Sequence, residues 1–546
     1  AASQVYYGKR LEDLTLAQMA MIAGLPKAPS KYNPISNEKR ALQRRDYVLR
    51  RMSENNFISK EEYVTAYLSP VSAKLNTASI ELRAPYVAEM VRAQMEERFG
   101  NDAYILGYDV FTTVDSKLQE AARQSLRKNI EKYDIRHGYR GPEGKINYGK
   151  LLNSDLEYDL EISKKNISKF LNSYYEINKN VPAVVLNVDK YSIKVYSKYN
   201  KLIDIHIDDI LIKNQYFDVN YRKKIKNFYS VLSIGDVIRI KEVNNKWKLS
   251  QVPNVNGALV SIDSNSGAIS ALSGGYDFRI SKFNRVTQAK RQPGSSFKPF
   301  IYSAALNKGY TPASIINDAP KVFKENTVSG AWRPKNYGGK FYGFTRLRYG
   351  LAKSINMISI RLLDSIGINY TLNYAKNFAL PTEKFPKDLT LALGSGEITP
   401  LELAQSYAYF SNGGYGIQPY LIEQVRKRNN EIIYVENPIR VCSNPCDYVS
   451  LDTLQFPSAK SVEEVQELRE IAGLPRFSMQ TLDPRNIYQM VSIMKDVVKY
   501  GTAKRAKVLK RSDIAGKTGT TNDQKDAWFS GFNRDIVAVS FLGFDD

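Results

Sequence analysis

Three short strings in the second half of the chain must meet in the folded protein if they are to act together. In sequence order they are Ser295-Ser296-Phe297-Lys298, Ser354-Ile355-Asn356 and Lys517-Thr518-Gly519. Together they supply a serine nucleophile, a nearby lysine base, a second hydroxyl, a side-chain amide and a cationic strand. Any one string occurs by chance in many proteins of this length, but the ordered set predicts a serine acyltransferase. The fold must therefore bring two helix starts beside one strand.

The first string is predicted to start a helix. Pro293-Gly294 precedes it and Pro299 follows it, and a proline is tolerated only in the first turn of a helix, so the helix should begin near Ser295. Lys298 then lies one turn further on the same face, where its amine can approach Ser295 Oγ. The alternative reading of Ser295, as a helix cap alone, becomes weak when the other two strings are present.

A lysine acts as a base only when it is neutral, so the pKa of Lys298 has to be lowered by burial or by a second cation. Lys517 is the natural candidate for that cation. The chain has two histidines, His137 and His206, and both fall in a segment that we expect to form a separate small domain. A Ser-His-Asp triad is therefore disfavoured, and lysine is the better base.

Ser354 precedes an apolar helical pattern, so taken alone it would be read as a helix cap. Beside Ser295 and Lys517 it becomes a candidate proton relay to the leaving amine, and Asn356 a candidate ligand for the peptide amide of the substrate. The pattern thus favours catalysis over capping only as part of the set.

The third string lies on or beside a strand, between Ile514-Ala515 and a closing hairpin. We expect Gly519 to leave room for a substrate backbone along that strand, and Thr518 and Thr520 to bind a carboxylate. The backbone N–H groups of Ser295 and Thr520 are the predicted oxyanion hole. A phosphate site is the alternative, but no GxxxxGK[ST] string is present to support it.

Composition limits the partners. The chain has 546 residues with 43% hydrophobic content, and 78 Lys plus Arg against 56 Asp plus Glu give a net charge of +22, which suits an anionic membrane surface or an acidic cell-wall polymer. The densest basic run, Arg222, Lys223, Lys224 and Lys226, is interpreted as a solvated face. No nucleic-acid motif accompanies it, so we expect no nucleic-acid partner.

The only cysteines, Cys442 and Cys446, are too few for a zinc site without histidine, so no metal is expected. A local disulfide and two free thiols both remain open. No stretch approaches the roughly 18 apolar residues of a membrane span. Because the chain opens without Met in what reads as the middle of a domain, we expect it to be a fragment.

The pattern of elements predicts a multidomain α+β protein. Residues 1–68 are helical, and 69–136 form a linker followed by a strand and a helix that we expect to join the C-terminal domain. Residues 137–254 have the short alternating strands of a small all-β, oligonucleotide/oligosaccharide-binding (OB) type of barrel. Residues 255–546 form a mixed α/β domain, which ends on two strands and is expected to be C-terminally truncated.

The whole set of strings, in the context Arg291-Gln292-Pro293-Gly294-Ser295-Ser296-Phe297-Lys298-Pro299, resembles the penicillin-binding, β-lactamase-like transpeptidase domain of class A penicillin-binding proteins. Further strings are similar to that family: Trp332-Arg333-Pro334-Lys335-Asn336-Tyr337, Leu393-Gly394-Ser395, Thr520-Thr521-Asn522-Asp523 and Asp526-Ala527-Trp528-Phe529. His137-Gly138-Tyr139-Arg140-Gly141-Pro142 resembles the start of the accessory barrel of the 1A type in Gram-negative bacteria.

Residues 1–68 resemble the tail of a family 51 glycosyltransferase domain, on Tyr6-Tyr7-Gly8-Lys9, Leu25-Pro26-Lys27-Ala28-Pro29 and Tyr32-Asn33-Pro34. The catalytic glutamates of that family lie upstream of residue 1, so we expect no glycan polymerisation by these residues alone. The resemblance implies a parent enzyme that polymerises lipid II and cross-links the resulting strands.

The resemblance implies a D-Ala-D-Ala transpeptidase or carboxypeptidase that needs no cofactor. Ser295 would attack the penultimate D-Ala of a peptidoglycan stem peptide, release the terminal D-Ala and pass the acyl group to an amine, and β-lactams would acylate the same serine. It also implies the periplasmic face of the inner membrane, an N-terminal anchor in the parent, and outer-membrane or elongation-machinery proteins as partners.

Two other functions share these residues. A serine β-lactamase needs a general base that activates water for deacylation, and no residue of the sequence obviously supplies one. A β-lactam-sensing or wall-binding scaffold would acylate or bind without turnover, but the presence of Lys298, Ser354 and Lys517 favours turnover.

Overall fold

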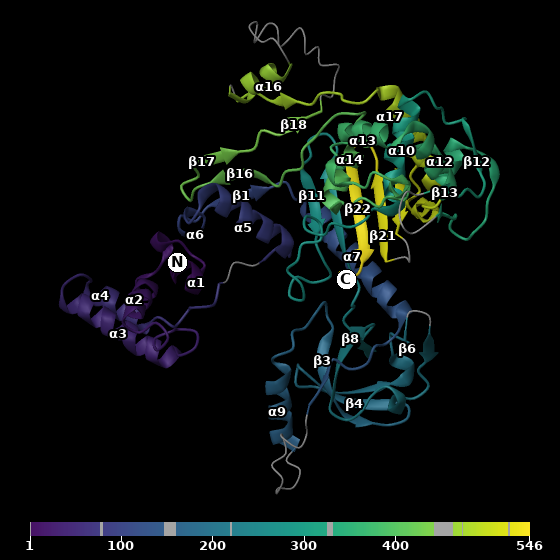
Figure 1. Cartoon of the computed structure of the whole chain (residues 1–546). Helices are drawn as coiled ribbons and strands as arrows, with labels where there is room; N and C mark the ends of the chain where they lie inside the picture. Colours follow the sequence, from purple (N-terminus) through teal and green to yellow (C-terminus); the bar gives the residue numbers. More distant parts are fainter. Residues whose placement is uncertain are drawn as a thin grey trace. The chain divides into compact units, whose positions relative to one another are not determined.

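The computed structural model describes residues 2–76, 80–146, 160–218, 221–324, 331–441, 462–471, 473–521 and 525–545. The chain divides into two compact units, Ala1–Arg83 and Ala84–Asp546 (Figure 1). Each unit is described separately. Cys442, Cys446, Asn522 and Asp523 lie outside the described residues.

The first unit is helical, as predicted. Its helices are α1 (Ala2–Tyr7), α2 (Leu16–Gly24), α3 (Glu38–Glu54) and α4 (Lys60–Leu68). Thr15 and Ser59 begin α2 and α4 with complete capping boxes, which satisfy N–H groups that a helix start leaves unpaired. The buried Arg45 of α3 donates to the carbonyls of Tyr67 (2.8 Å) and Ser69 (2.6 Å), and so fixes the end of α4 on α3.

The second unit begins with segments that pair with residues far along the chain. They are α5 (Pro85–Phe99), α6 (Asp102–Ile105), β1 (Asp109–Thr112) and α7 (Ser116–His137). Strand β1 runs antiparallel to β16 (Ile422–Arg426), which also pairs with β17 (Ile432–Val435). The strand and helix before the β-rich segment therefore belong with the residues that follow it, as the sequence suggested.

The β-rich segment forms an antiparallel sheet with the order β2-β8-β3-β4-β5, and β9 also pairs with β8. Its strands are β2 (Gly144–Lys145), β3 (Val181–Val188), β4 (Ser192–Ser197), β5 (Leu202–His206), β8 (Asp236–Val243) and β9 (Lys246–Ser250). Helix α9 (Leu160–Leu171) packs on one side through Ile167 and Leu171. A separate hairpin joins β6 (Asn214–Tyr216) to β7 (Arg222–Lys224). The alternating β-branched residues of β3, β4 and β5 form the core.

The main sheet of the C-terminal part has five antiparallel strands in the order β11-β10-β22-β21-β20. They are β10 (Asn256–Asp263), β11 (Ile269–Ser273), β20 (Ala515–Thr520), β21 (Asp526–Phe532) and β22 (Ile536–Gly543). The first strand in the sequence, β10, thus pairs with the last, β22. Strand β20, which carries Lys517, lies at the edge.

Helices cover both faces of this sheet. Because side chains alternate along a strand, Val537, Val539 and Phe541 of β22 join one core, while Leu542 packs with α7 on the opposite face. The helices of the first core are α10 (Lys298–Asn307), α11 (Leu347–Ala352), α12 (Asn356–Ile366), α13 (Ile368–Ala375), α14 (Pro400–Ser411) and α17 (Pro484–Lys499), gathered beside β21 and β22 in Figure 1. Thr399 and Glu402 form a capping box at the start of α14.

The remaining elements are short. Two hairpin-like pairs flank α12: β12 (Ile315–Asp318) with β15 (Gly343–Arg346), and β13 (Phe323–Lys324) with β14 (Ala331–Trp332). Strand β18 (Ile439–Arg440) pairs in parallel with β19 (Arg476–Phe477), and α16 spans Val462–Ile471.

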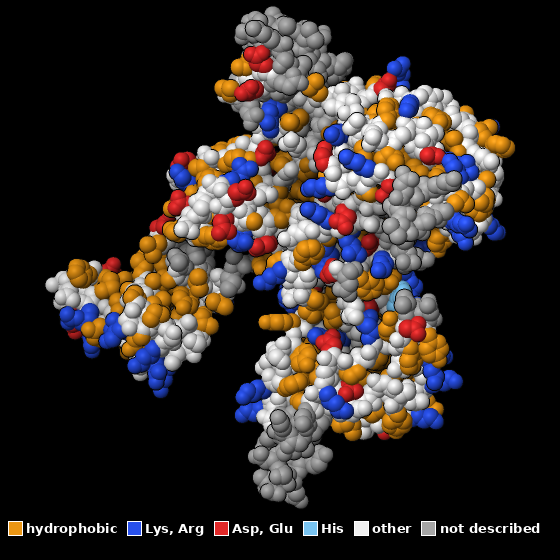
Figure 2. Space-filling view, viewed as in Figure 1, with side chains coloured by type: hydrophobic (Ala, Val, Ile, Leu, Met, Phe, Trp, Pro, Cys, Tyr) orange, Lys and Arg blue, Asp and Glu red, His pale blue; other side chains and the backbone are white. Residues whose placement is uncertain are grey.

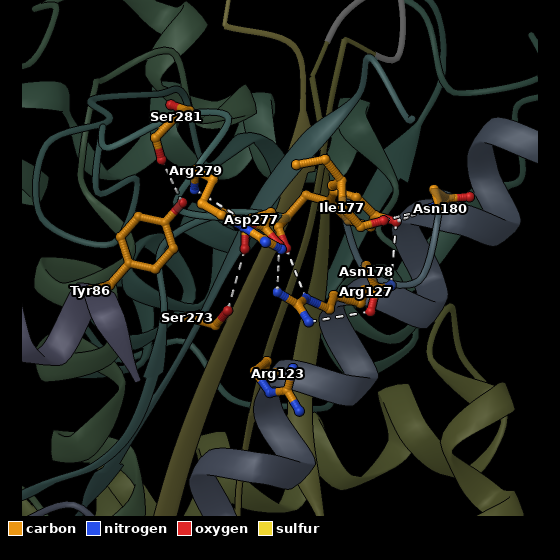
Figure 3. Close-up of polar contacts among 12 residues, drawn as sticks. Tyr86, Arg123, Arg127, Ile177, Asn178, Asn180, Ser273, Asp277, Arg279 and Ser281 are labelled. Atoms are coloured by element: carbon orange, nitrogen blue, oxygen red, sulfur yellow. Dashed lines mark hydrogen bonds and ion pairs between the residues drawn. The ribbon is translucent and has the colours of Figure 1, made fainter. Parts of the chain in front are cut away.

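Helix α7 ties the β-rich segment to the main sheet. Arg127 donates to the Tyr276 carbonyl (2.8 Å), to Asp277 (3.2 Å) and to Asn178 (3.2 Å), as Figure 3 shows for the two side chains. Asn178 precedes β3, whereas Tyr276 and Asp277 follow β11. Glu131, one turn further along α7, accepts from the Tyr276 hydroxyl at 2.8 Å. One helix therefore fixes both parts through charged and polar contacts.

Figure 2 shows Lys and Arg side chains scattered over the face of the molecule that it displays, interleaved with acidic and apolar groups. Among the helices of the described residues, none combines the length and the apolar character that a membrane span requires.

Candidate active site

The nucleophile candidate lies in a tight turn and not in the α-helix itself. Residues Gly294–Phe297 form a 3₁₀ turn, and α10 begins only at Lys298, with Pro299 in its first turn. The predicted helix start near Ser295 was therefore three residues early. Pro299 must lie in the first turn of its helix, but this requirement does not tell whether the residues before it form a 3₁₀ turn or part of the α-helix. Ser295 is half-buried, and no hydrogen bond joins its Oγ to another described residue.

Close backbone packing holds this turn in place. Gly294 has φ +55°, and a Cβ added there would lie 2.6 Å from the Thr520 carbonyl oxygen, so the turn sits directly against the end of β20. On its other side, a Cβ at Gly394 would overlap the Gly294 carbonyl. The buried Tyr407 hydroxyl donates to the Ser296 carbonyl at 2.7 Å, and burial keeps the pKa of Tyr407 well above its usual range.

Lys298 is fully buried and points toward the second string. Its Nζ donates to the Ser354 carbonyl (2.9 Å) and to Asn356 Oδ1 (2.8 Å), and it lies 3.4 Å from Ser354 Oγ. Burial, and then the positive charge of Lys517, hold the pKa of Lys298 well below its usual value. Within the described residues neither buried amine has a carboxylate partner, so the neutral form of Lys298 is favoured.

Lys517 approaches the same hydroxyl from the other side. Its Nζ donates to Ser354 Oγ at 2.8 Å and to the Thr518 carbonyl at 2.9 Å. Like Lys298 it is fully buried, and burial lowers the pKa of Lys517 to about 7. The Ser354 hydroxyl therefore lies between two buried amines, and a proton can pass from one to the other through it.

Ser354 is not a helix cap. Helix α12 begins at Asn356 with Ile355 at its N-cap position, whereas Ser354 has φ +59° in the left-handed region. That conformation is costly for a residue with a side chain and is found where the surrounding structure enforces it, often at functional sites. It turns the Ser354 carbonyl to Lys298 while the hydroxyl faces Lys517.

Both ends of the Asn356 amide are occupied. Oδ1 accepts from Lys298, and Nδ2 donates to the Lys335 carbonyl at 3.0 Å. Asn356 therefore orients the Lys298 side chain. Binding a substrate amide, as the sequence predicted, would add to these contacts or replace the one with Lys335.

The exposed edge of β20 carries the predicted carboxylate ligands. Thr521 N–H donates to the Asp526 carbonyl in the ladder with β21, so by the alternation of antiparallel pairs the peptide groups of Thr518 and Thr520 face away from β21. The Thr518 hydroxyl is 2.6 Å from that of Thr502. Sequence reasoning missed Thr502, which stands in a loop after α17 with no periodic pattern to single it out.

Gly519 lies in close contact with the turn that carries Ser295. A Cβ at this position would overlap the Pro293 carbonyl oxygen and lie 2.7 Å from Ser296 Oγ and 2.9 Å from Trp528 Cβ. The missing side chain therefore lets the Ser295 turn pack on β20, and room for a substrate backbone along the strand stays a prediction. The glycine in the sequence indicated that another group approaches the backbone closely here, but it could not identify that group as the turn at Pro293.

Replacing Gly519 by alanine should consequently damage both the fold and the site. We expect the free energy of unfolding to fall by about 1–3 kcal/mol from overpacking, and acylation by a fluorescent penicillin to slow at the same protein concentration. Gly367→Ala is the control, because nothing lies within 4 Å of that position and only backbone strain at φ +92° is added. Acylation unchanged in Gly519→Ala would contradict this packing role.

In the part of the chain that the structure describes, no three His, Cys, Asp or Glu side chains gather as metal ligands. His137 ends α7 and His206 ends β5, both away from the three strings in the sequence. The groups gathered at the site are hydroxyls, amines and an amide, which suit acyl transfer.

Comparisons with known proteins define the class. The family model for the penicillin binding protein transpeptidase domain matches residues 257–540, the model for the penicillin-binding protein OB-like domain matches 139–255, and the transglycosylase model matches 1–53. The chain therefore belongs to the penicillin-binding proteins. It combines a helical transglycosylase segment, an OB-like domain and a transpeptidase domain.

Individual relatives place the chain within that family. It is 42% identical to penicillin-binding protein 1A of Pseudomonas aeruginosa and 40% identical to penicillin-binding protein 1A of Neisseria meningitidis, in each case over the whole chain. The chain spans 66% and 63% of the lengths of these two relatives. The crystal structure of penicillin-binding protein 1A from Haemophilus influenzae is 36% identical, with a TM-score of 0.78 over all of this chain and 78% of that one.

Proposed function

We propose that this chain is a peptidoglycan D,D-transpeptidase that cross-links stem peptides through an acyl-enzyme on Ser295. The observation that carries the proposal is the Ser354 hydroxyl, which lies between the buried amines of Lys298 and Lys517. Asn356 accepts a hydrogen bond from Lys298, and Ser295 lies in the turn that precedes Lys298. The resemblance of the site to a penicillin-recognising serine acyltransferase, and membership of the family, support the substrate class.

In the first half-reaction, neutral Lys298 takes the proton of the Ser295 hydroxyl, and Oγ attacks the carbonyl carbon of the penultimate D-Ala. The N–H groups of Ser295, in the 3₁₀ turn before α10, and of Thr520, on the edge of β20 away from β21, receive the developing oxyanion. The C–N bond to the terminal D-Ala breaks, and Ser354 passes the proton from the lysine pair to the departing amine. An ester on Ser295 and a free D-Ala are the products.

In the second half-reaction an amine of a neighbouring stem attacks the ester carbonyl. The same groups act in reverse: the amine loses a proton through Ser354 to the lysine pair, and Ser295 Oγ leaves with a proton from Lys298. Before the first bond breaks, Thr518, with Thr502 beside it, and Thr520 hold the carboxylate of the donor's terminal D-Ala. A β-lactam enters as a mimic of that donor and stays on Ser295 as a slowly released ester.

The roles of the parent protein follow from its relatives. We infer that the helical unit belongs to a glycosyltransferase domain that polymerises lipid II, and that the parent works on the periplasmic side of a bacterial membrane. Outer-membrane or elongation-machinery proteins are the candidate partners, and neither the motifs nor the scattered charge favours nucleic acid.

The test is labelling by a fluorescent penicillin. We expect stoichiometric labelling of the wild-type chain and none of Ser295→Ala, because the ester forms on that hydroxyl. Ser296→Ala is the matched control, since its hydroxyl is one residue away but fully buried and has no hydrogen-bond partner among the described residues. Equal labelling of the wild type and Ser295→Ala would exclude Ser295 as the nucleophile.

A second measurement separates turnover from mere binding. The wild-type chain should release D-Ala from a peptide ending in D-Ala-D-Ala, which a penicillin sensor or scaffold would not do. Rapid turnover of a chromogenic β-lactam would instead identify a β-lactamase.

A further inference from the structure

Helix α12, which carries Asn356, has no cap of its own. Its N-cap residue is Ile355, whose side chain accepts no hydrogen bond, although the first N–H groups of a helix need partners. Asn336, from a loop far earlier in the chain, fills this role: its Oδ1 accepts from Met357 N–H at 3.1 Å. The start of α12 is therefore fixed by a residue of the string Arg333-Pro334-Lys335-Asn336-Tyr337, to which the reaction assigns no role.

Asn336 is itself held by a buried carboxylate. Its Nδ2 donates to both oxygens of Asp318, at 2.8 and 3.0 Å, and to the Lys340 carbonyl at 2.9 Å. Asp318 ends β12 and is 1% exposed, and it also accepts from Tyr342 N–H at 2.8 Å. No lysine, arginine or histidine among the described residues forms an ion pair with it. Hydrogen bonds alone therefore compensate its burial, which makes their geometry demanding.

The hydrogen-bonded pair of Asp318 and Asn336 fixes the position of the Lys335 carbonyl, which orients the Asn356 side chain. Lys335 immediately precedes Asn336, and its carbonyl accepts from Asn356 Nδ2 at 3.0 Å. With Nδ2 so engaged, the opposite end of the amide, Oδ1, faces Lys298 Nζ at 2.8 Å. A loop that shifted would release Nδ2 and leave the amide free to rotate, and Lys298 would lose one of its acceptors. A chain of contacts thus runs from a buried carboxylate to the proposed base.

We propose that Asp318 and Asn336 are positioning residues for acylation, which set the Lys335 carbonyl so that the Asn356 amide aims Lys298 at Ser295. The inference rests on the proposed function and adds two residues that do not touch the substrate. Their effect passes through Asn356, and this distinguishes it from a general contribution to stability.

A double-mutant cycle with fluorescent penicillin tests this. Asn336→Asp keeps the shape and the acceptor for Met357 N–H but replaces the donor with a carboxylate that faces Asp318. We expect the acylation rate constant to fall by about 10- to 100-fold, as for other misplaced reacting groups. Adding Asn336→Asp to Asn356→Ala should not lower the acylation rate constant further, because Asn356→Ala has already removed the amide through which Asn336 acts on Lys298. The double variant Asp318→Asn/Asn336→Asp restores an amide–carboxylate pair and should regain much of the rate.

Asp364→Asn is the control, since it makes the same change as Asp318→Asn but at an exposed carboxylate of α12 that is paired with Lys321. It should acylate at the wild-type rate, and circular dichroism should report whether each variant is folded. Additive losses in the cycle, or a wild-type rate in Asn336→Asp, would overturn the inference while leaving Ser295 labelling intact. A wild-type chain that fails to label at Ser295 would overturn the proposed function and this inference with it.

Discussion

Replacing Lys298 by methionine should slow acylation of Ser295 by about 10²- to 10⁴-fold, the range that loss of a positioned base produces. Methionine is similar in length and readily buried, but it cannot accept the Ser295 proton. Lys298 lies within hydrogen-bond distance of Asn356 and close to Ser354, and burial with the Lys517 charge lowers its pKa, so its amine is available as a neutral base. Stopped-flow or quenched labelling with a fluorescent penicillin measures the rate constant.

Lys308→Met makes the same change just beyond the C-terminal end of α10, where the amine donates to the Ile366 carbonyl at 2.7 Å. It should leave the acylation rate constant near that of the wild type. A Lys298→Met protein that is folded, by circular dichroism, and still labels at the wild-type rate would show that another group takes the proton.

The second large effect is on stability as a function of pH. An unfolded chain holds the proton of a lysine up to about pH 10.4, whereas burial lowers the pKa of Lys517 to about 7 and that of Lys298 well below its usual value. Between these values the unfolded chain binds more protons than the folded one. The free energy of unfolding must therefore rise with pH, by about 1.4 kcal/mol per pH unit for each such lysine.

Urea unfolding between about pH 7.5 and about pH 9.5 checks this slope. Lys517→Met should remove one lysine's contribution, so that its stability rises less steeply with pH than that of the wild type. Parallel curves would show that the amine keeps its ordinary pKa. The wild-type acylation rate should fall as the pH drops below about 7, where the Lys517 amine becomes protonated and can no longer take a proton from Ser354.

The sequence predicted the elements of the site better than their local geometry. The order of the three strings required a nucleophile turn, a second hydroxyl and a lysine strand to meet. Lys298 does lie within hydrogen-bond distance of Ser354 and Asn356, and Lys517 within hydrogen-bond distance of Ser354. Their roles in catalysis remain proposals. Local rules sufficed because each string carries its own helix or strand signal.

Other features depended on contacts distant in the sequence. The left-handed conformation of Ser354, the turn at Ser295 and the packing of Gly519 on Pro293 are decided by neighbours that no local pattern identifies. Thr502 and Asn336 matter through hydrogen bonds to residues 16 and 21 positions further along the chain, beyond the reach of a local pattern. Propensity and periodicity describe neighbours in sequence, so such residues become visible only when the fold places them.

The order of strands in the main sheet also sets an order of assembly. Strand β20 reaches the rest of the sheet only through β21 and then β22, and β22 itself pairs with β10, near the start of the domain. Until Ile536–Gly543 has been synthesised and has paired with β10 and β21, the strand that carries Lys517 is not joined to the rest of the sheet. Reaction with a penicillin is consequently a reporter of completed folding, because a nascent or partly unfolded chain lacks the paired amines that activate its serine.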